Sequence, residues 1–108
     1  KYLYAGDFSC GFALIKLNEW EYTYIDKSGK QATPQKFMLA GNFRDCFARV
    51  MINGKWGYID NKFQIALKPE YDFASDFRDG FAYVWKGNKC MVVNSSFQVI
   101  WSYHFDEK

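Results

Sequence analysis

Carboxylate and amide side chains recur at one position of this sequence, where each ends an Ile-Asp or Val-Asn pair. They are Asp26, Asp60 and Asn94. Paired carboxylates can act as general acid and base, whereas a calcium loop needs several oxygen ligands within about a dozen residues. These three residues lie a full repeat apart, and each is followed by turn-forming residues. We therefore interpret them as Asx turns, in which the side chain accepts hydrogen bonds from its own backbone.

The remaining candidates for catalysis or metal binding are few. Asp72, Asp76 and Asp79 are closely spaced, and we interpret them as a solvated linker, with weak cation binding as the alternative. His104 is the only histidine, so no histidine-centred acid–base or nucleophilic site is expected. The sequence predicts a protein that is not an enzyme and that has no cofactor and no metal, with a hydrolase based on paired carboxylates as the residual alternative.

The three cysteines, Cys10, Cys46 and Cys90, do not form a recognisable ligand or disulfide pattern. Their number is odd, their positions within the repeat differ, and no Cys-x-x-Cys spacing is present. We interpret them as small apolar residues, without a disulfide framework or a zinc site. The cysteines leave the cellular compartment open.

The composition excludes several classes of protein. Fourteen basic and twelve acidic residues are interspersed along the chain and give a net charge of +2, which argues against a nucleic-acid surface. No stretch approaches 18 apolar residues, so no membrane span is expected. Eleven Phe, eight Tyr and four Trp in 108 residues must dominate the packing, and they are too many for all to be buried.

A repeat of about 34 residues organises the whole chain. The sequence Ala-x-x-Phe ends at Phe8, Phe43 and Phe77, and a Phe-Ala pair begins at Phe12, Phe47 and Phe81. These positions divide the chain into a single domain of three units, at about residues 6–40, 41–74 and 75–108. Residues 1–5 align with the end of a unit, so we expect the chain to be a piece of a longer array.

The second unit shows the expected elements most clearly. Residues 47–52 alternate apolar and other side chains at period two, which predicts a strand. Asn53-Gly54 is a strong hairpin signal, and residues 55–60 return as a second strand. Residues 64–67 predict a third strand that Pro69 ends, before an irregular linker.

The same pattern extends to the other units. Third strands are expected at residues 30–33 and 98–101, and the linker of the second unit is expected at Glu70 to Asp76. One such meander is marginally stable alone, so each unit is expected to cover the apolar side of its neighbour. The predicted fold is all-β, a tandem array of three-stranded antiparallel meanders.

The sequence Gly-Lys-Trp-Gly-Tyr-Ile-Asp, which contains Trp56, Gly57 and Tyr58, resembles the bacterial WG repeat, also called the KWG repeat. The resemblance covers the whole chain. It is strongest in the second unit and weakest in the third, which lacks both Trp and Gly and which we interpret as a cap. Phe63 and Phe97 occupy the turn glycine of the family, so a different type of turn is expected there. The resemblance implies a non-catalytic tandem β-array.

One side of the first strand differs between units and is the candidate binding face. Its members are Arg49, Met51, Tyr83 and Trp85, of types that are enriched at interfaces. The alternative is that this side packs against a neighbouring unit or is plain solvent-facing surface. Arrays of open sheets offer edges and broad surfaces, so we expect a protein-interaction or scaffolding module whose partner is a protein or peptide. A carbohydrate or cell-envelope binding module that uses exposed aromatics is the alternative.

Overall fold

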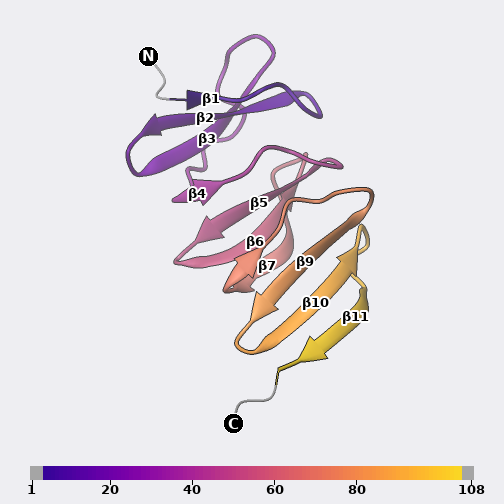
Figure 1. Cartoon of the computed structure of the whole chain (residues 1–108). Coiled ribbons are helices and arrows are strands. Elements are labelled where there is room, and N and C mark those ends of the chain that lie inside the picture. The colour runs from indigo at the N-terminus through magenta and orange to yellow at the C-terminus, as the bar shows by residue number, and fades with distance from the viewer. Residues whose placement is uncertain (1–3, 106–108) are drawn as a thin grey trace.

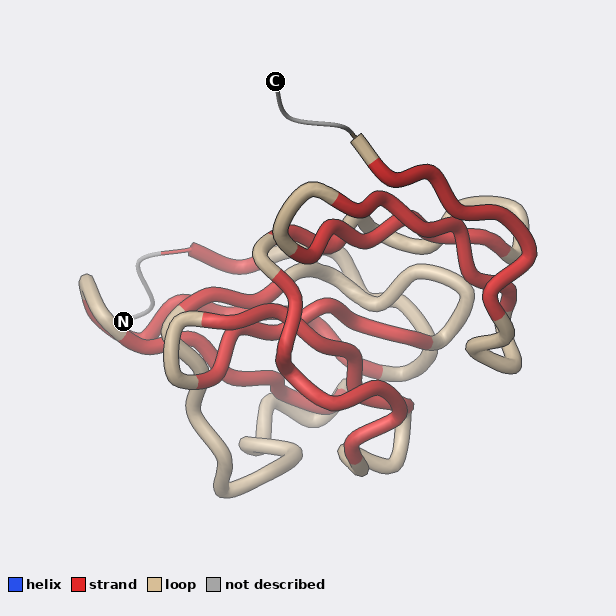
Figure 2. The backbone as a smooth tube through the Cα atoms, turned by 90° about the horizontal axis from the view of Figure 1, so that it is seen from below, coloured by secondary structure: helices blue, strands red, loops and turns tan. Residues whose placement is uncertain are grey.

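The computed structural model describes residues 4–105, which form three antiparallel sheets that follow one another along the long axis (Figure 1). The molecule measures 50 × 27 × 19 Å. Over the described residues the regular structure consists of strands joined by loops and turns (Figure 2). The predicted all-β tandem array is confirmed. Within the same residues there is no helix long and apolar enough to cross a membrane.

Each sheet is built around a long hairpin. In sheets B and C one further strand lies on each side of the hairpin, and in sheet A a further strand lies on one side. The strand orders are β1-β2-β3 in sheet A, β4-β5-β6-β7 in sheet B and β8-β9-β10-β11 in sheet C. The strands are β1 (Tyr4–Ala5), β2 (Phe12–Asn18), β3 (Glu21–Asp26), β4 (Leu39–Ala40), β5 (Phe47–Ile52), β6 (Lys55–Asp60), β7 (Ile65–Tyr71), β8 (Phe73–Ala74), β9 (Phe81–Lys86), β10 (Lys89–Asn94) and β11 (Val99–His104).

The hairpin of sheet B forms as its turn sequence predicts. Asn53 and Gly54 have φ angles of 54° and 81°, and they join β5 to β6. Two positive φ angles define a turn whose twist matches the twist of the two strands, which is why Asn-Gly is favoured there.

The segment between sheets B and C consists mostly of strand. β7 continues to Tyr71 in sheet B, and after Asp72 the chain enters sheet C as β8, which pairs with β9. The prediction of an irregular linker over residues 70–76 is therefore wrong, because the backbone pairs with one sheet and then with the next. The change of sheet lies at residue 72, slightly before the predicted unit boundary at residue 74.

Gly57 is required because the third strand bulges toward it. A Cβ at this position would lie 2.5 Å from the carbonyl oxygen of Leu67 and 2.7 Å from Cα of Pro69. The register of β6 and β7 shifts opposite Gly57. A bulge tolerates a proline because no ladder bond is lost there. Pro69 thus lies within β7, and the prediction that it ends the strand is wrong.

The first unit does not form the third strand that was predicted at residues 30–33. One isolated bridge, between Gln31 and Ile25, connects this segment to β3; a second joins Phe37 to Tyr22, and between the two the chain leaves the sheet. Thr23 stands where the second unit has Gly57, and its buried hydroxyl donates a 2.7 Å hydrogen bond to the Gln35 carbonyl. A side chain here occupies the space that a bulged strand needs. The segment between β3 and β4 instead forms a wide loop (Figure 1).

The two largest apolar clusters lie between the sheets, as the expected stacking of units requires. One joins sheets A and B, and the other joins sheets B and C. Phe43 and Phe77 are at their centres and are 1% and 2% exposed. Phe8, the equivalent residue of the first unit, is 45% exposed because sheet A is the first sheet of the structure.

Two phenylalanines adopt the left-handed backbone conformation in turns where the first unit has Gly29. Phe63 and Phe97 have φ angles of 63° and 59°. Their N–H groups donate to the carbonyls of Asp60 and Asn94, as the N–H of Gly29 does to Asp26. The expectation of a different turn is therefore wrong. The ring of Phe63 packs 5.8 Å from that of Phe43, so burial offsets the unfavourable φ.

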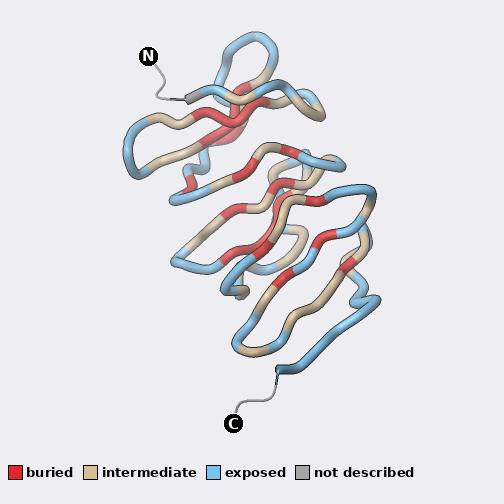
Figure 3. The backbone as a smooth tube through the Cα atoms, in the orientation of Figure 1, coloured by how far each residue is buried: buried red, intermediate tan, exposed pale blue. Residues whose placement is uncertain are grey.

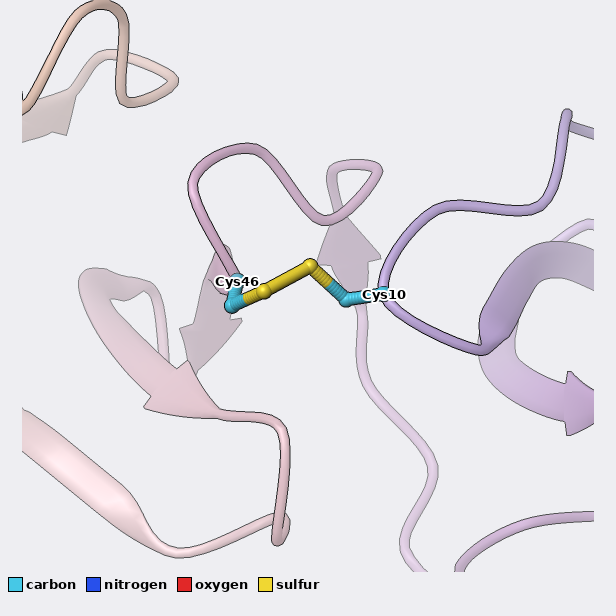
Figure 4. The surroundings of a disulfide bond; sticks show 2 residues. All are labelled: Cys10 and Cys46. Carbon is cyan, nitrogen blue, oxygen red and sulfur yellow. A yellow bond between two sulfur atoms is a disulfide. The ribbon is translucent and has the colours of Figure 1, made fainter.

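A disulfide links the first two units, which corrects the interpretation of the cysteines as unpaired apolar residues. Cys10 and Cys46 lie in the two-residue turns before β2 and β5, and their Cα atoms are 5.5 Å apart (Figure 4). Their sequence separation of 36 is about one repeat, so stacking of the units brings the turns together. Cys90 is free.

Candidate docking face

Each sheet turns one side toward the following unit, and we call this side its forward face. Residues that are paired across neighbouring strands share a face of a sheet, so the register identifies its members. On sheet B they form the rows Arg49–Tyr58–Leu67 and Met51–Trp56–Tyr71. On sheet A they form the rows Leu14–Tyr24 and Lys16–Tyr22–Phe37. The following sheet covers both of these faces.

The forward face of sheet C is built on the same rows, but none of the other residues between 4 and 105 covers it. Its members are Tyr83–Val92–Trp101 and Trp85–Cys90–Tyr103. Tyr83, Trp101 and Tyr103 are 47%, 53% and 51% exposed, whereas Tyr58 in the covered row of sheet B is fully buried. Figure 3 shows β11 exposed along its whole length, at the end of the molecule opposite the first sheet.

Aromatic rings on this face hold one another in place. Trp85 and Phe105 stack with centroids 5.2 Å apart and planes within 4° of parallel. Trp101 and Tyr103 lie 6.2 Å apart at 10°, and Tyr103 meets the edge of Phe105 at 4.7 Å. Rings fixed in this way lose little side-chain entropy when a partner covers them, which favours binding.

A hollow of about 540 Å³ lies beside the two rows of the forward face of sheet C, and Val92 is among the residues that line it. Val92 occupies the repeat position of Tyr58 in the second unit. Phe81, Tyr83 and Val92 supply its apolar wall, and Arg44 and Arg78 lie at its border. Phe81 is 47% exposed, whereas its equivalent in the second unit, Phe47, packs against Phe77. The hollow therefore occupies the position that the next unit's Phe fills at the two internal junctions.

Comparison with family models identifies the repeat. The model of the WG containing repeat matches residues 22–56 and 56–90, two tandem windows that together cover more than half of the chain. The chain belongs to the WG repeat family. Among curated proteins no sequence matches it. The Trp-Gly pair of the family is Trp56-Gly57, which packs beneath the bulge of β7, and in the third WG unit Cys90 and Met91 stand in its place.

The four predicted binding residues divide into two pairs. Arg49 and Met51 lie on the covered forward face of sheet B, in the contact with the third WG unit. Arg49 donates to the Ala74 carbonyl at 3.1 Å, and its Nε lies 3.1 Å from Oδ1 of Asp76. Their position corresponds to the alternative interpretation, contact with a neighbouring unit. Tyr83 and Trp85 lie together on the open forward face of sheet C.

Two tyrosine hydroxyls fasten consecutive WG units. Tyr24 donates to the Gly41 carbonyl and Tyr58 to the Ser75 carbonyl, both at 2.6 Å. Burial raises the pKa of both phenols well above the usual value, so both stay protonated and able to donate across the physiological range.

The recurring acidic position forms turns. Oδ1 of Asp60 accepts hydrogen bonds from the backbone N–H groups of Lys62 and Gln64, and Asp26 and Asn94 accept equivalent bonds. A hydrogen bond from the Ser28 hydroxyl is the largest cause that lowers the pKa of Asp26. Over residues 4–105, no cluster of three or more His, Cys, Asp or Glu side chains has the geometry to hold a metal ion.

Sequence reasoning did not identify Trp101, Tyr103 and Phe105 as members of the candidate face. Trp101 and Tyr103 alternate on β11, and Phe105 continues the same period one residue after the end of the strand, which was a usable signal. The equivalent residues of the second WG unit, Leu67 and Tyr71, lie on the covered face of sheet B and are partly buried. Exposure follows from the position of the unit in the array, which the alternation does not encode.

Proposed function

We propose that this chain is a non-catalytic protein-binding module that presents the forward face of sheet C to another protein. One observation carries the proposal: the rows that are buried under a neighbour on sheets A and B are repeated on sheet C with exposed aromatic side chains. A soluble domain gains by covering such a face, since apolar burial contributes about 25 cal/mol per Å².

The free edge of β11 adds a second means of recognition. β11 is the last strand in the order of sheet C, so its outer N–H and C=O groups have no strand partner among the described residues of that sheet. An extended segment of another protein can pair with such an edge while its side chains contact the flanking aromatics. The proposal is consistent with the structural roles of the acidic residues, whose oxygens accept backbone hydrogen bonds.

Site-specific photo-crosslinking in cells of the source organism tests this function. A photoreactive phenylalanine at position 101 should crosslink to one or a few defined proteins, identified by mass spectrometry. The same residue at position 20 is the matched control, because Trp20 is 76% exposed but lies in the hairpin loop of the first unit. Equal or absent protein crosslinking from the two positions would overturn the proposal.

Carbohydrate binding is a second candidate that the ring geometry favours. The near-parallel pairs Trp85–Phe105 and Trp101–Tyr103 offer flat surfaces of the kind on which sugar rings stack. A panel of soluble glycans, titrated while tryptophan fluorescence is recorded, separates the two functions. A saturable response that Trp101→Ser removes would favour the glycan, and a flat response would favour a protein.

A further inference from the structure

The charge of the three forward faces indicates what covers the third, provided that the proposed protein-binding function holds. The faces of sheets A and B each contain a basic residue, Lys16 and Arg49. Arg49 faces Asp76, which the third unit supplies. The rows of sheet C contain no charged side chain. These neutral rows can meet a copy of themselves without repulsion between like charges, and the charged residues Arg44, Asp76 and Arg78 line the hollow beside them.

The forward face of sheet C also lacks the groups that fasten a following WG unit. Tyr24 and Tyr58 donate to the next unit at both internal junctions, but Val92 occupies the equivalent position and cannot donate. Tyr83 replaces Arg49, so the ion pair that Arg49 makes with Asp76 at the second junction has no counterpart on this face. The face thus retains its apolar area but lacks the polar contacts that hold a following WG unit. The interpretation of this unit as a cap explains the loss of the polar contacts but not the retained apolar area.

At the opposite end of the array, the described residues from 4 onward do not offer a matching apolar surface. Ala13 and Ile15 are equivalent to residues of sheets B and C that pack against the preceding unit. Both are already buried, at 2% and 1% exposed. Phe8 is accessible there, at 45%, and belongs to the part of the first unit that the structure describes. A head-to-tail contact would require a broad open face at both ends. The described residues have one at the C-terminal sheet.

We infer that two copies of this chain associate through the forward face of sheet C, about a two-fold axis. A single open, neutral and apolar face is self-complementary under two-fold symmetry, and such an interface closes at two subunits. Two sheets that pack face to face lie about 10 Å apart, which is a distance that interleaved aromatic side chains fill. Trp85, Trp101 and Tyr103 supply the anchors, since Trp and Tyr dominate the energetics of many interfaces.

Cys90 provides a direct measurement of this geometry. It lies between Trp85 and Tyr103 in one row of the face, and it is the free thiol of the chain, since Cys10 and Cys46 are joined. A bismaleimide with a spacer of about 8–13 Å should convert the protein to a covalent dimer, because facing sheets bring the two thiols within that range. Cys90→Ser should remove the product. No crosslink while the protein sediments as a dimer would place the interface elsewhere and overturn the inference.

Sedimentation equilibrium of the oxidised chain from about 1 to 200 µM tests the association itself. We expect a reversible monomer–dimer equilibrium, weakened at least tenfold by Trp101→Ser and by Tyr83→Arg, which restores a charge to the face. Both side chains are about half exposed, so the variants should keep the thermal midpoint of the monomer. Trp20→Ser is the matched control and should leave the equilibrium unchanged.

A chain that stays monomeric at the highest concentration would overturn the inference, as would a dimer that neither Trp101→Ser nor Tyr83→Arg weakens. In that case the crosslinking experiment above still decides the proposed function. A crosslink from position 101 to a different protein would retain that function with another partner. The absence of any protein crosslink would reject both proposals.

Discussion

The junction between the first and second WG units and the junction between the second and third share one aromatic socket. At each junction a Phe of the following unit, Phe43 or Phe77, enters beside a Tyr of the preceding unit. The Tyr hydroxyl then donates to a carbonyl of the following unit at 2.6 Å. The shared socket shows which contacts the repeat itself requires.

The turns that precede the long hairpins are fastened differently at the two junctions. At the first junction Cys10 forms a disulfide with Cys46. At the second junction the turn residue Asp45 accepts a hydrogen bond from the N–H of Gly80 at 2.7 Å. Cys10 and Asp45 are the first residues of their turns, and Cys46 and Gly80 are the second. The same two positions therefore carry a covalent bond in one junction and a polar contact in the other.

Polar contacts are concentrated at the second junction. Arg49 lies near Asp76 there and over the ring of Trp56, at 4.9 Å from its centroid. The equivalent pair at the first junction is Leu14 and Asn42, which cannot form an ion pair. The comparison indicates that the disulfide holds the junction with fewer polar contacts. Because disulfides persist in oxidising compartments, the stability of the first junction depends on the redox environment.

Truncation of the socket phenylalanines should have the largest effect. Phe43→Ala and Phe77→Ala should each lower the free energy of unfolding by about 3–5 kcal/mol, because each removes a fully buried ring. Urea denaturation followed by circular dichroism measures the change. Phe8→Ala is the matched control at the same repeat position, and it should cost well under half as much because Phe8 is exposed. Equal losses in all three would contradict the socket.

Loss of the disulfide should rank second. Cys10→Ser with Cys46→Ser should lower the free energy of unfolding by about 3–4 kcal/mol, as expected for a closed loop of 36 residues. Reduction of the unmodified chain should have a similar effect, again measured by urea denaturation.

A rebuilt turn provides the control for that variant. Cys10→Asp with Cys46→Gly copies Asp45 and Gly80 of the second junction. It should recover about 0.5–1.5 kcal/mol relative to the serine variant, because it restores a hydrogen bond and places Gly at a positive φ. No recovery would mean that the two turns are not interchangeable.

Removal of the Arg49 charge should have a smaller effect. Arg49→Leu copies the first junction and should cost about 1 kcal/mol, discounted because both partners are partly exposed. Much of that cost arises from an unpaired Asp76. The double variant with Asp76→Asn copies both residues of the first junction and should recover stability. A loss in the double variant equal to the sum of the two single losses would show that the residues act independently.

Acid pH should have the smallest specific effect, through Asp72. Its pKa is lowered mainly by a hydrogen bond from Lys55, and also by the N–H of Gly87. A carboxyl whose pKa is lower in the folded state binds fewer protons there. Its contribution is therefore present above about pH 4, and it is lost as the pH falls through the lowered pKa.

The contact between Lys55 and Asp72 belongs to the second junction, and Met38 occupies the position of Asp72 at the first junction. Asp72→Asn should therefore flatten the decline of the urea midpoint between pH 6 and about pH 2.5. Asp26→Asn is the comparison, since the pKa of Asp26 is also lowered but its bonds lie within one turn. If Asp72→Asn leaves the acid decline unchanged, Asp72 does not fasten the second junction.

Local patterns in the sequence determine the strands and the turns. The alternation in residues 47–52 and the Asn53-Gly54 pair specify a hairpin because backbone conformation and side-chain period are properties of neighbouring residues. The recurrence of Phe43 and Phe77 specifies the repeat and, with it, the stacking of like units. The path of the third strand follows less directly, since a bulge under Pro69 depends on the space above Gly57.

Relations between units are decided only in the tertiary structure. Cys10 and Cys46 form no recognisable disulfide pattern in the sequence, but stacked turns bring their Cα atoms within disulfide range. Tyr58 and Trp101 are both apolar members of forward faces, yet one is buried and the other is exposed. The sequence by itself determined the fold of each unit and its repetition. The arrangement of neighbours decided which face is open, because burial depends on what lies opposite a residue in space.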